Sequence, residues 1–165
     1  MRIATAVLTL FLVINGCSQP LPPPLPESSA DHEDALPRPS DRTALLAELE
    51  RRFDRWVREG PLAYELKVSR LCFCDPGIPW VSENRGPKVV SSRGGFLSDG
   101  RDIGPPLRTV WQLFAEAERA AESTAEEVTV WFDPTLHYPV RIHIDRERGS
   151  ADDELTWVAE LTVLR

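Results

Sequence analysis

Apolar and polar residues alternate most clearly in the last part of the chain, between Val128 and Leu164. A period of two residues is typical of a β-strand that turns one face toward a core. Two pairs of turn-forming residues, Asp133-Pro134 and Gly149-Ser150, interrupt the alternation. The segment is therefore predicted to form three antiparallel strands. Its apolar positions are Val128, Val130, Val140, Ile142, Ile144, Leu155, Trp157, Ala159, Leu161 and Val163.

A second set of strands is predicted in the middle of the chain. Residues 62–74 alternate between apolar and polar side chains, and Asp75-Pro76-Gly77 then supplies a turn. Two shorter runs follow, at residues 80–82 and 88–92. We therefore expect three more strands here, followed by a Gly- and Pro-rich loop.

Two helices are predicted from apolar residues spaced three and four positions apart, which form one stripe along a helix. The first helix is expected from an N-cap at Ser40 to about Glu59, where Gly60-Pro61 ends it. The second begins with a capping box between Thr109 and Gln112 and runs to about Glu122. The predicted stripes are Leu45, Leu46, Leu49, Phe53, Trp56 and Val57 in the first helix, and Val110, Trp111, Phe114, Ala117 and Ala121 in the second.

The order of these elements is helix, three strands, helix, three strands. It predicts an α+β fold in which an antiparallel sheet of about five or six strands is packed by two amphipathic helices. Residues 40–165 contain all of the predicted elements. We expect them to form a single domain.

The first residues have the features of an export signal. Arg2 precedes an apolar run at residues 3–14. A membrane span needs about 20 residues, so this run is too short to cross and suits the core of a signal peptide at residues 1–16. The run ends in Ile14-Asn15-Gly16-Cys17, which resembles the lipobox of bacterial lipoproteins. An ordinary secretory signal followed by an incidental cysteine is the alternative.

The lipobox resemblance implies cleavage before Cys17, acylation of that residue and attachment to membrane lipid. It also implies a location in the cell envelope, and Ser18 is similar to signals that sort lipoproteins to the periplasmic side of the outer membrane in hosts with two membranes. Seven prolines lie among polar residues at 17–39, a composition that predicts a disordered tether. The net charge is -7, and no basic cluster with interleaved aromatic residues indicates nucleic acid as a partner.

Four short motifs occur in the same order as in a known family. They are Tyr64 leading a strand that ends in Cys72-Phe73-Cys74, the segment Thr109-Val110-Trp111-Gln112-Leu113-Phe114, the segment Phe132-Asp133-Pro134-Thr135-Leu136-His137-Tyr138-Pro139, and Ile142-His143-Ile144-Asp145. Residues 45–164 thus resemble an uncharacterised domain-of-unknown-function family, numbered sixty-one seventy-four, of small bacterial envelope proteins. The resemblance implies a fold and a compartment but no activity.

The third motif departs from the family pattern at two positions. Phe132 replaces Tyr, and His137 replaces a Gly whose left-handed backbone costs a histidine more. Asp133 and Pro134 are predicted to form a turn in which the Asp carboxylate accepts bonds from backbone amides ahead of it. Tyr138 and Pro139 are expected to restart the strand and pack beside it.

Cys72 and Cys74 form the main candidate site. In an oxidising envelope the pair predicts a disulfide, although residues two apart in an extended strand place their Cα atoms near the upper limit for bridging. Two reduced thiols, a metal site and a redox role are the alternatives. A metal would need further ligands, and the three histidines, His32, His137 and His143, show no spacing that relates them to the cysteines. No metal or cofactor is therefore predicted.

No sequence motif of a hydrolase, a nucleotide-binding enzyme or a zinc protease occurs in the chain. We therefore favour a non-enzymatic binding module that meets another envelope protein. Arg141 and His143, on the polar face of their strand, are its expected contact row. The alternative is a thiol-redox or metal-handling protein that uses Cys72 and Cys74, and a hydrolase with an unrecognised site is a third hypothesis.

Overall fold

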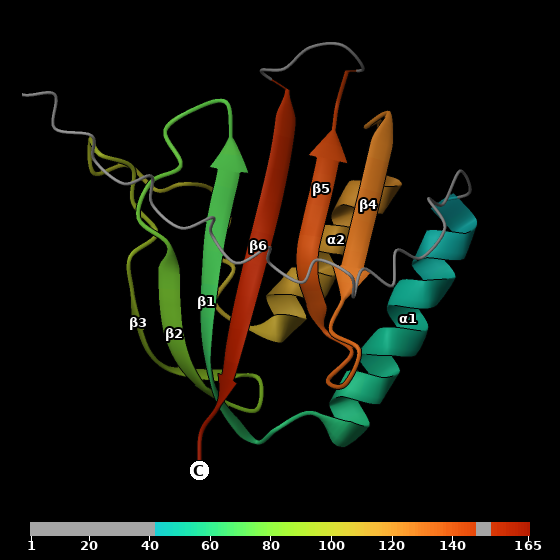
Figure 1. The fold of residues 1–165 in the computed structure, drawn as a ribbon, viewed down its shortest axis with the longest axis vertical. Helices are drawn as coiled ribbons and strands as arrows, with labels where there is room; N and C mark the ends of the chain where they lie inside the picture. The colour runs from blue at the N-terminus through green and yellow to red at the C-terminus, as the bar shows by residue number, and fades with distance from the viewer. Residues whose placement is uncertain (1–41, 148–152) are drawn as a thin grey trace, which may run out of the picture. The chain divides into compact units, whose positions relative to one another are not determined.

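A computed structural model describes residues 42–147 and 153–165 of the chain. The elements are α1 (Arg42–Glu59), β1 (Ala63–Cys72), β2 (Trp80–Arg85), β3 (Lys88–Arg93), α2 (Val110–Glu122), β4 (Glu127–Phe132), β5 (Pro139–Asp145) and β6 (Glu154–Val163). The predicted α+β class is confirmed (Figure 1). The expected signal peptide, Cys17, the tether, Ser40 and the Gly149-Ser150 turn lie outside the described residues.

All six strands form one antiparallel sheet in the order β3-β2-β1-β6-β5-β4. The two sets of three strands meet where β1 pairs with β6, in a register that sets Tyr64 opposite Val163 and Cys72 opposite Leu155. Local alternation predicts each strand but not this pairing, because it joins segments that are far apart in the sequence. The β1–β6 ladder makes the sheet continuous.

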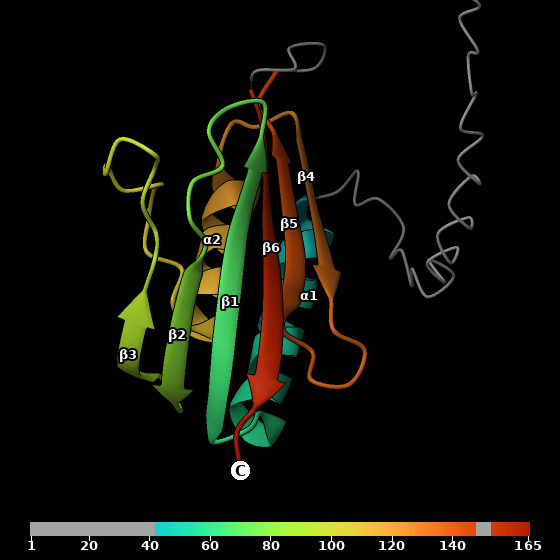
Figure 2. The ribbon, with the colours of Figure 1, turned by 60° about the vertical axis from the view of Figure 1, so that its left-hand side comes forward.

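Both helices lie on the same side of the sheet (Figure 2). Helix α2 packs against β4 and β5, and its predicted capping box is present, with the Thr109 side chain accepting a bond from the Gln112 amide at 3.1 Å. Helix α1 packs mainly on α2, where the ring of Phe53 contacts that of Trp111 at 4.8 Å. It reaches the sheet through Trp56, whose ring lies 5.6 Å from that of Tyr64.

The core lies between the helices and the sheet. Its largest fully buried side chains include Trp157, Tyr64, Leu66, Ile103, Leu113 and Ile142. Glu116 is also buried, and its carboxylate accepts a bond from the Trp157 indole at 3.3 Å and pairs with Arg119 at 2.6 Å. A buried charge is tolerated when it is paired in this way.

Two positions of the predicted helix stripes are wrong, and so is Val163 of the closing strand, which is 52% exposed at the end of β6. Val57 is 52% exposed, and Trp111 is 39% exposed with one edge against Phe53. Each lies at the margin of its helix stripe, where a small rotation of the helix decides burial. None of the described helices is long and apolar enough to cross a membrane.

Candidate functional site

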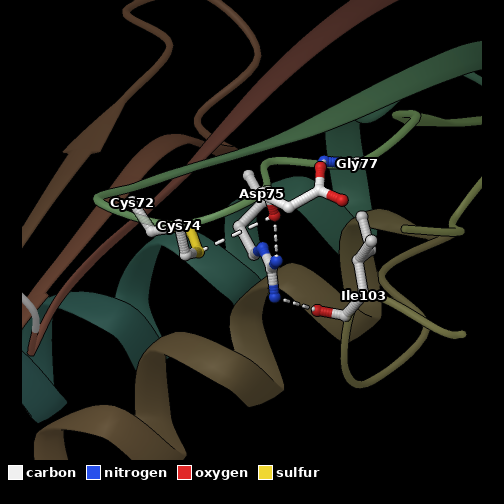
Figure 3. Close-up of a disulfide and its surroundings, with 6 residues drawn as sticks. Cys72, Cys74, Asp75, Gly77 and Ile103 are labelled. Atoms are coloured by element: carbon white, nitrogen blue, oxygen red, sulfur yellow. Dashed lines mark hydrogen bonds between the residues drawn. A yellow bond between two sulfur atoms is a disulfide. The ribbon is translucent and has the colours of Figure 1, made fainter. Parts of the chain in front are cut away.

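The two cysteines lie where β1 ends, and their sulfur atoms are joined in a disulfide (Figure 3). Cys72 is the last residue of the strand, and the chain bends through Phe73 and Cys74. This bend brings the two Cα atoms to 5.1 Å, well inside the range for disulfides. The expected separation near the upper limit is therefore wrong, because it assumed that the strand continues through Cys74.

The residue between the cysteines is turned outward. Phe73 is 81% exposed, Cys74 is exposed and Cys72 is partly buried. Three more large apolar side chains nearby in the chain or on the adjacent loop are also exposed, namely Leu71 at 48%, Ile78 at 60% and Phe96 at 46%. We call Leu71, Phe73, Ile78 and Phe96 the apolar tip.

Two loops carry three of the four tip residues, and Leu71 lies in β1. The turn at residues 73–79 follows β1, and the loop at 94–106 follows β3. They join in an antiparallel bridge, in which the Ile78 amide donates to the Phe96 carbonyl at 2.7 Å. This bridge sets two of the exposed apolar residues side by side.

Asp75 fixes the shape of the turn. Its carboxylate accepts bonds from the Gly77 amide at 2.9 Å and from Ser98, through the amide at 2.9 Å and the hydroxyl at 2.7 Å. These bonds, the Ser98 hydroxyl first, lower the pKa of Asp75 to about 2. The carboxylate is therefore ionised at neutral pH and ties the turn to the neighbouring loop.

A second set of hydrogen bonds, donated by Arg70, links the turn to the loop that follows β3. The Arg70 guanidinium donates to the Asp75 carbonyl and, at 2.8 Å, to the Ile103 carbonyl. Gly77 has a φ of 70°, and a Cβ at this position would lie 2.3 Å from the Ile103 side chain. The turn therefore needs glycine here, both for its backbone conformation and for space.

The disulfide contributes little to holding the domain together. It closes a ring of three residues, for which the chain-entropy model gives only about 1.6 kcal/mol of stabilisation. Strand β1 is already paired with β2 on one side and with β6 on the other. The disulfide therefore acts locally, by holding Phe73 in its outward position.

Among the residues that the structure describes, which exclude His32, no metal ligands are brought to the cysteines. His137 precedes the start of β5 and His143 lies within it, whereas Cys72 ends β1. Within residues 42–147 and 153–165, no group of three or more His, Cys, Asp or Glu side chains is placed to hold a metal ion. The two sulfurs are engaged with each other instead.

The family-motif turn lies at the opposite end of the sheet, between β4 and β5. The Asp133 carboxylate accepts bonds from the amides of Thr135 at 2.8 Å and Leu136 at 2.6 Å, as predicted. Pro134 lies within the turn, and Pro139 begins β5 and is buried, also as predicted.

Two side chains of this turn pack inward. Tyr138 is only 4% exposed and lies edge-on to Trp56, and burial raises its pKa to about 12. His137 has a left-handed backbone with a φ of 62°. Its ring nitrogens lie 3.1 Å from Arg52 and 3.3 Å from Arg55, and burial together with these two cations lowers its pKa. The turn is thus docked on α1.

The predicted contact row lies on the face of the sheet that points away from the helices. Arg141 is exposed and stacks over the ring of Trp131 at 5.2 Å. The Nδ1 atom of His143 lies 2.9 Å from the Thr156 hydroxyl, so its ring is held against β6.

Phe73, Arg70 and Asp75 were not predicted as site residues. A phenylalanine between two cysteines at the end of an alternating strand was the available indication of an exposed aromatic residue. The bonds of Asp75 to Ser98 and of Arg70 to Ile103 join segments that no local pattern relates.

A family model described as "Family of unknown function (DUF6174)" matches residues 48–163. This range covers the described fold from residue 48, within α1, to the end of β6. Searches of curated proteins and of solved structures find no match.

Proposed function

The chain belongs to this family of unknown function, and we propose that it is a non-enzymatic binding module that holds a protein of the cell envelope through its apolar tip. In this proposal the helices and the sheet are the scaffold, with both amphipathic helices covering one face. The disulfide turn presents the residue that the partner recognises.

One observation carries the proposal: Phe73 is 81% exposed on a turn that a disulfide closes. Large apolar side chains gathered on a surface are typical of interaction sites. Burying one phenylalanine contributes about 1.5–3 kcal/mol, which corresponds to roughly a 10- to 100-fold change in affinity. Because the turn is already ordered, little conformational entropy is lost when a partner binds it.

The partner is proposed to be a protein with an apolar pocket. Ile78 of the same turn pairs with Phe96 in an antiparallel bridge, and these two exposed apolar residues are proposed to add to the contact that Phe73 makes, since aromatic anchors are common in binding hot spots.

Features of the sequence support a location of this module in the envelope. The lipobox-like segment supports acylation of Cys17 and anchoring in the membrane, and the Pro-rich residues that follow support a tether. An anchor with two or more acyl chains holds a protein stably at a membrane. The domain would therefore meet its partner near the membrane surface, on the periplasmic side of the outer membrane where two membranes exist.

Site-specific photo-crosslinking tests this proposal. A photoreactive phenylalanine analogue replaces Phe73 in the full-length chain, in membranes of the native host. A matched control carries the analogue at Val57, which is 52% exposed on α1. We expect a discrete crosslinked protein from position 73 that is absent from position 57. The same products from both positions, or none from position 73, would refute the proposal.

A further inference from the structure

We infer that the Cys72–Cys74 disulfide is an exchange site for a protein dithiol, and that Cys74 is the sulfur that the incoming thiolate attacks. The inference rests on the proposed function in one respect, which is that the partner protein binds at the apolar tip. The chemistry of the disulfide itself does not depend on that binding.

Exposure distinguishes the two cysteines. Cys74 is exposed, whereas Cys72 is partly buried at the end of β1. Thiol–disulfide exchange requires a thiolate to approach one sulfur of the pair, and its rate depends on access. The outward position of Cys74 therefore makes it the site of attack.

The turn keeps its anchors when the disulfide opens. Arg70 holds the Asp75 carbonyl, and the Asp75 carboxylate holds Gly77 and Ser98, without help from either sulfur. The ladders of β1 with β2 and β6 also remain. The protein can therefore pass between a disulfide and a dithiol form without unfolding, which a reversible exchange site requires.

A positive charge lies close to the attacked residue. The Cys74 sulfur is 3.7 Å from the Asp75 carbonyl oxygen, the same atom that accepts a bond from the Arg70 guanidinium. A guanidinium near a cysteine favours the anionic form of its sulfur. Arg70 is thus placed to stabilise Cys74 when it is released as a thiolate.

The exchange proceeds in two steps. First, one thiolate of the partner attacks the Cys74 sulfur, so that a mixed disulfide forms and Cys72 leaves as a thiolate. Next, the second thiolate of the partner attacks the first partner sulfur, which is bonded to Cys74 in the mixed disulfide. Cys74 then leaves as a thiolate beside Arg70. The partner dithiol is oxidised to a disulfide and its two electrons end on Cys72 and Cys74, while the protons that the partner thiols release to water balance those that the cysteine thiolates take up from it.

Reduced glutathione is the probe for the first step. The oxidised full-length chain is incubated with it under native conditions, quenched with acid, alkylated and mapped by mass spectrometry of its peptides, which report Cys17 separately. We expect glutathione on Cys74 and the alkyl group on Cys72, in at least tenfold excess over the reverse arrangement. Modification that requires denaturant, or that places glutathione on Cys72, would overturn the inference.

The two proposals fail separately in these experiments. Glutathione needs no apolar pocket, so exchange at Cys74 without a crosslink from position 73 would retain the exchange site and remove the binding function. A crosslink without exchange under native conditions would do the reverse.

Discussion

Two turns of this domain use the same hydrogen bonding but direct their side chains differently. In both, an aspartate carboxylate accepts bonds from backbone amides ahead of it, Asp75 at the end of β1 and Asp133 at the end of β4. They lie at opposite ends of the sheet (Figure 1). In each turn, the same kind of hydrogen bond, from a backbone amide to an aspartate carboxylate, therefore fixes the backbone.

Their aromatic residues have opposite surroundings. Tyr138 follows the Asp133 turn and is 4% exposed against Trp56, whereas Phe73 precedes Asp75 and is 81% exposed. A helix covers the first turn, and a disulfide closes the chain beside the second. The comparison teaches that the aspartate sets the shape of a turn, while its neighbours decide whether it supports the core or presents a surface.

The largest effect is expected from a matched pair of variants, each of which loses one aromatic ring. Tyr138→Ala removes a buried ring and should lower the free energy of unfolding by about 3–5 kcal/mol. Phe73→Ala removes an exposed ring and should change it by no more than about 0.5 kcal/mol. Urea denaturation followed by tryptophan fluorescence measures both. Equal losses from the two variants would mean that the turns do not differ in role.

A smaller effect is expected from opening the disulfide. Replacing both Cys72 and Cys74 by serine removes a three-residue ring and should lower the free energy of unfolding by about 1.6 kcal/mol at most. The domain should still unfold in a single transition, because β1 keeps both of its ladders. Thermal and urea unfolding of the oxidised protein and the serine variant give this difference. A loss of unfolding free energy as large as that of Tyr138→Ala would show that the disulfide stabilises the whole domain and not only its own turn.

The smallest effect is an acid-dependent one at Asp75. Its pKa falls from 3.8 to about 2 on folding, so the folded state binds fewer protons than the unfolded state between these values. The stability that Asp75 contributes is therefore present above about pH 4 and is lost as the pH falls toward about 2. Asp75→Asn should be less stable than the parent near neutral pH, and the difference should shrink at acid pH.

Urea midpoints of the two proteins at a series of pH values test this prediction, since the other carboxylates contribute equally to both. A difference that stays constant with pH would show that the charge of Asp75 does not hold its turn.

The sequence predicted what depends on neighbours in the chain. The Thr109–Gln112 capping box and the Asp133 turn were predicted from residues within a few positions of each other, and both are present. The strands were predicted to within a few residues, because each carries its own alternation. The adjacent placement of β1 and β6 was not predicted, since every strand with one apolar face could have paired there.

The candidate site was predicted only in part. The disulfide was favoured from two cysteines in a chain expected to be exported, but the bend after Cys72 was not foreseen, and it decides the geometry. The anchors of the turn, Arg70 with Ile103 and Asp75 with Ser98, depend on how the loop after β3 folds back. The exposure of Phe73 follows from that arrangement, and no periodicity in the sequence indicates it.

The pairing of β1 with β6 also bears on when the domain can fold. The centre of the sheet joins Tyr64 to Val163, so the sheet cannot be completed until almost the whole domain has been synthesised. Contacts between such distant segments make folding slow, in the range of milliseconds to seconds for β-rich proteins. In the proposed export of the chain across a membrane, such a delay would keep the domain unfolded until translocation, because the sheet cannot close before β6 is available.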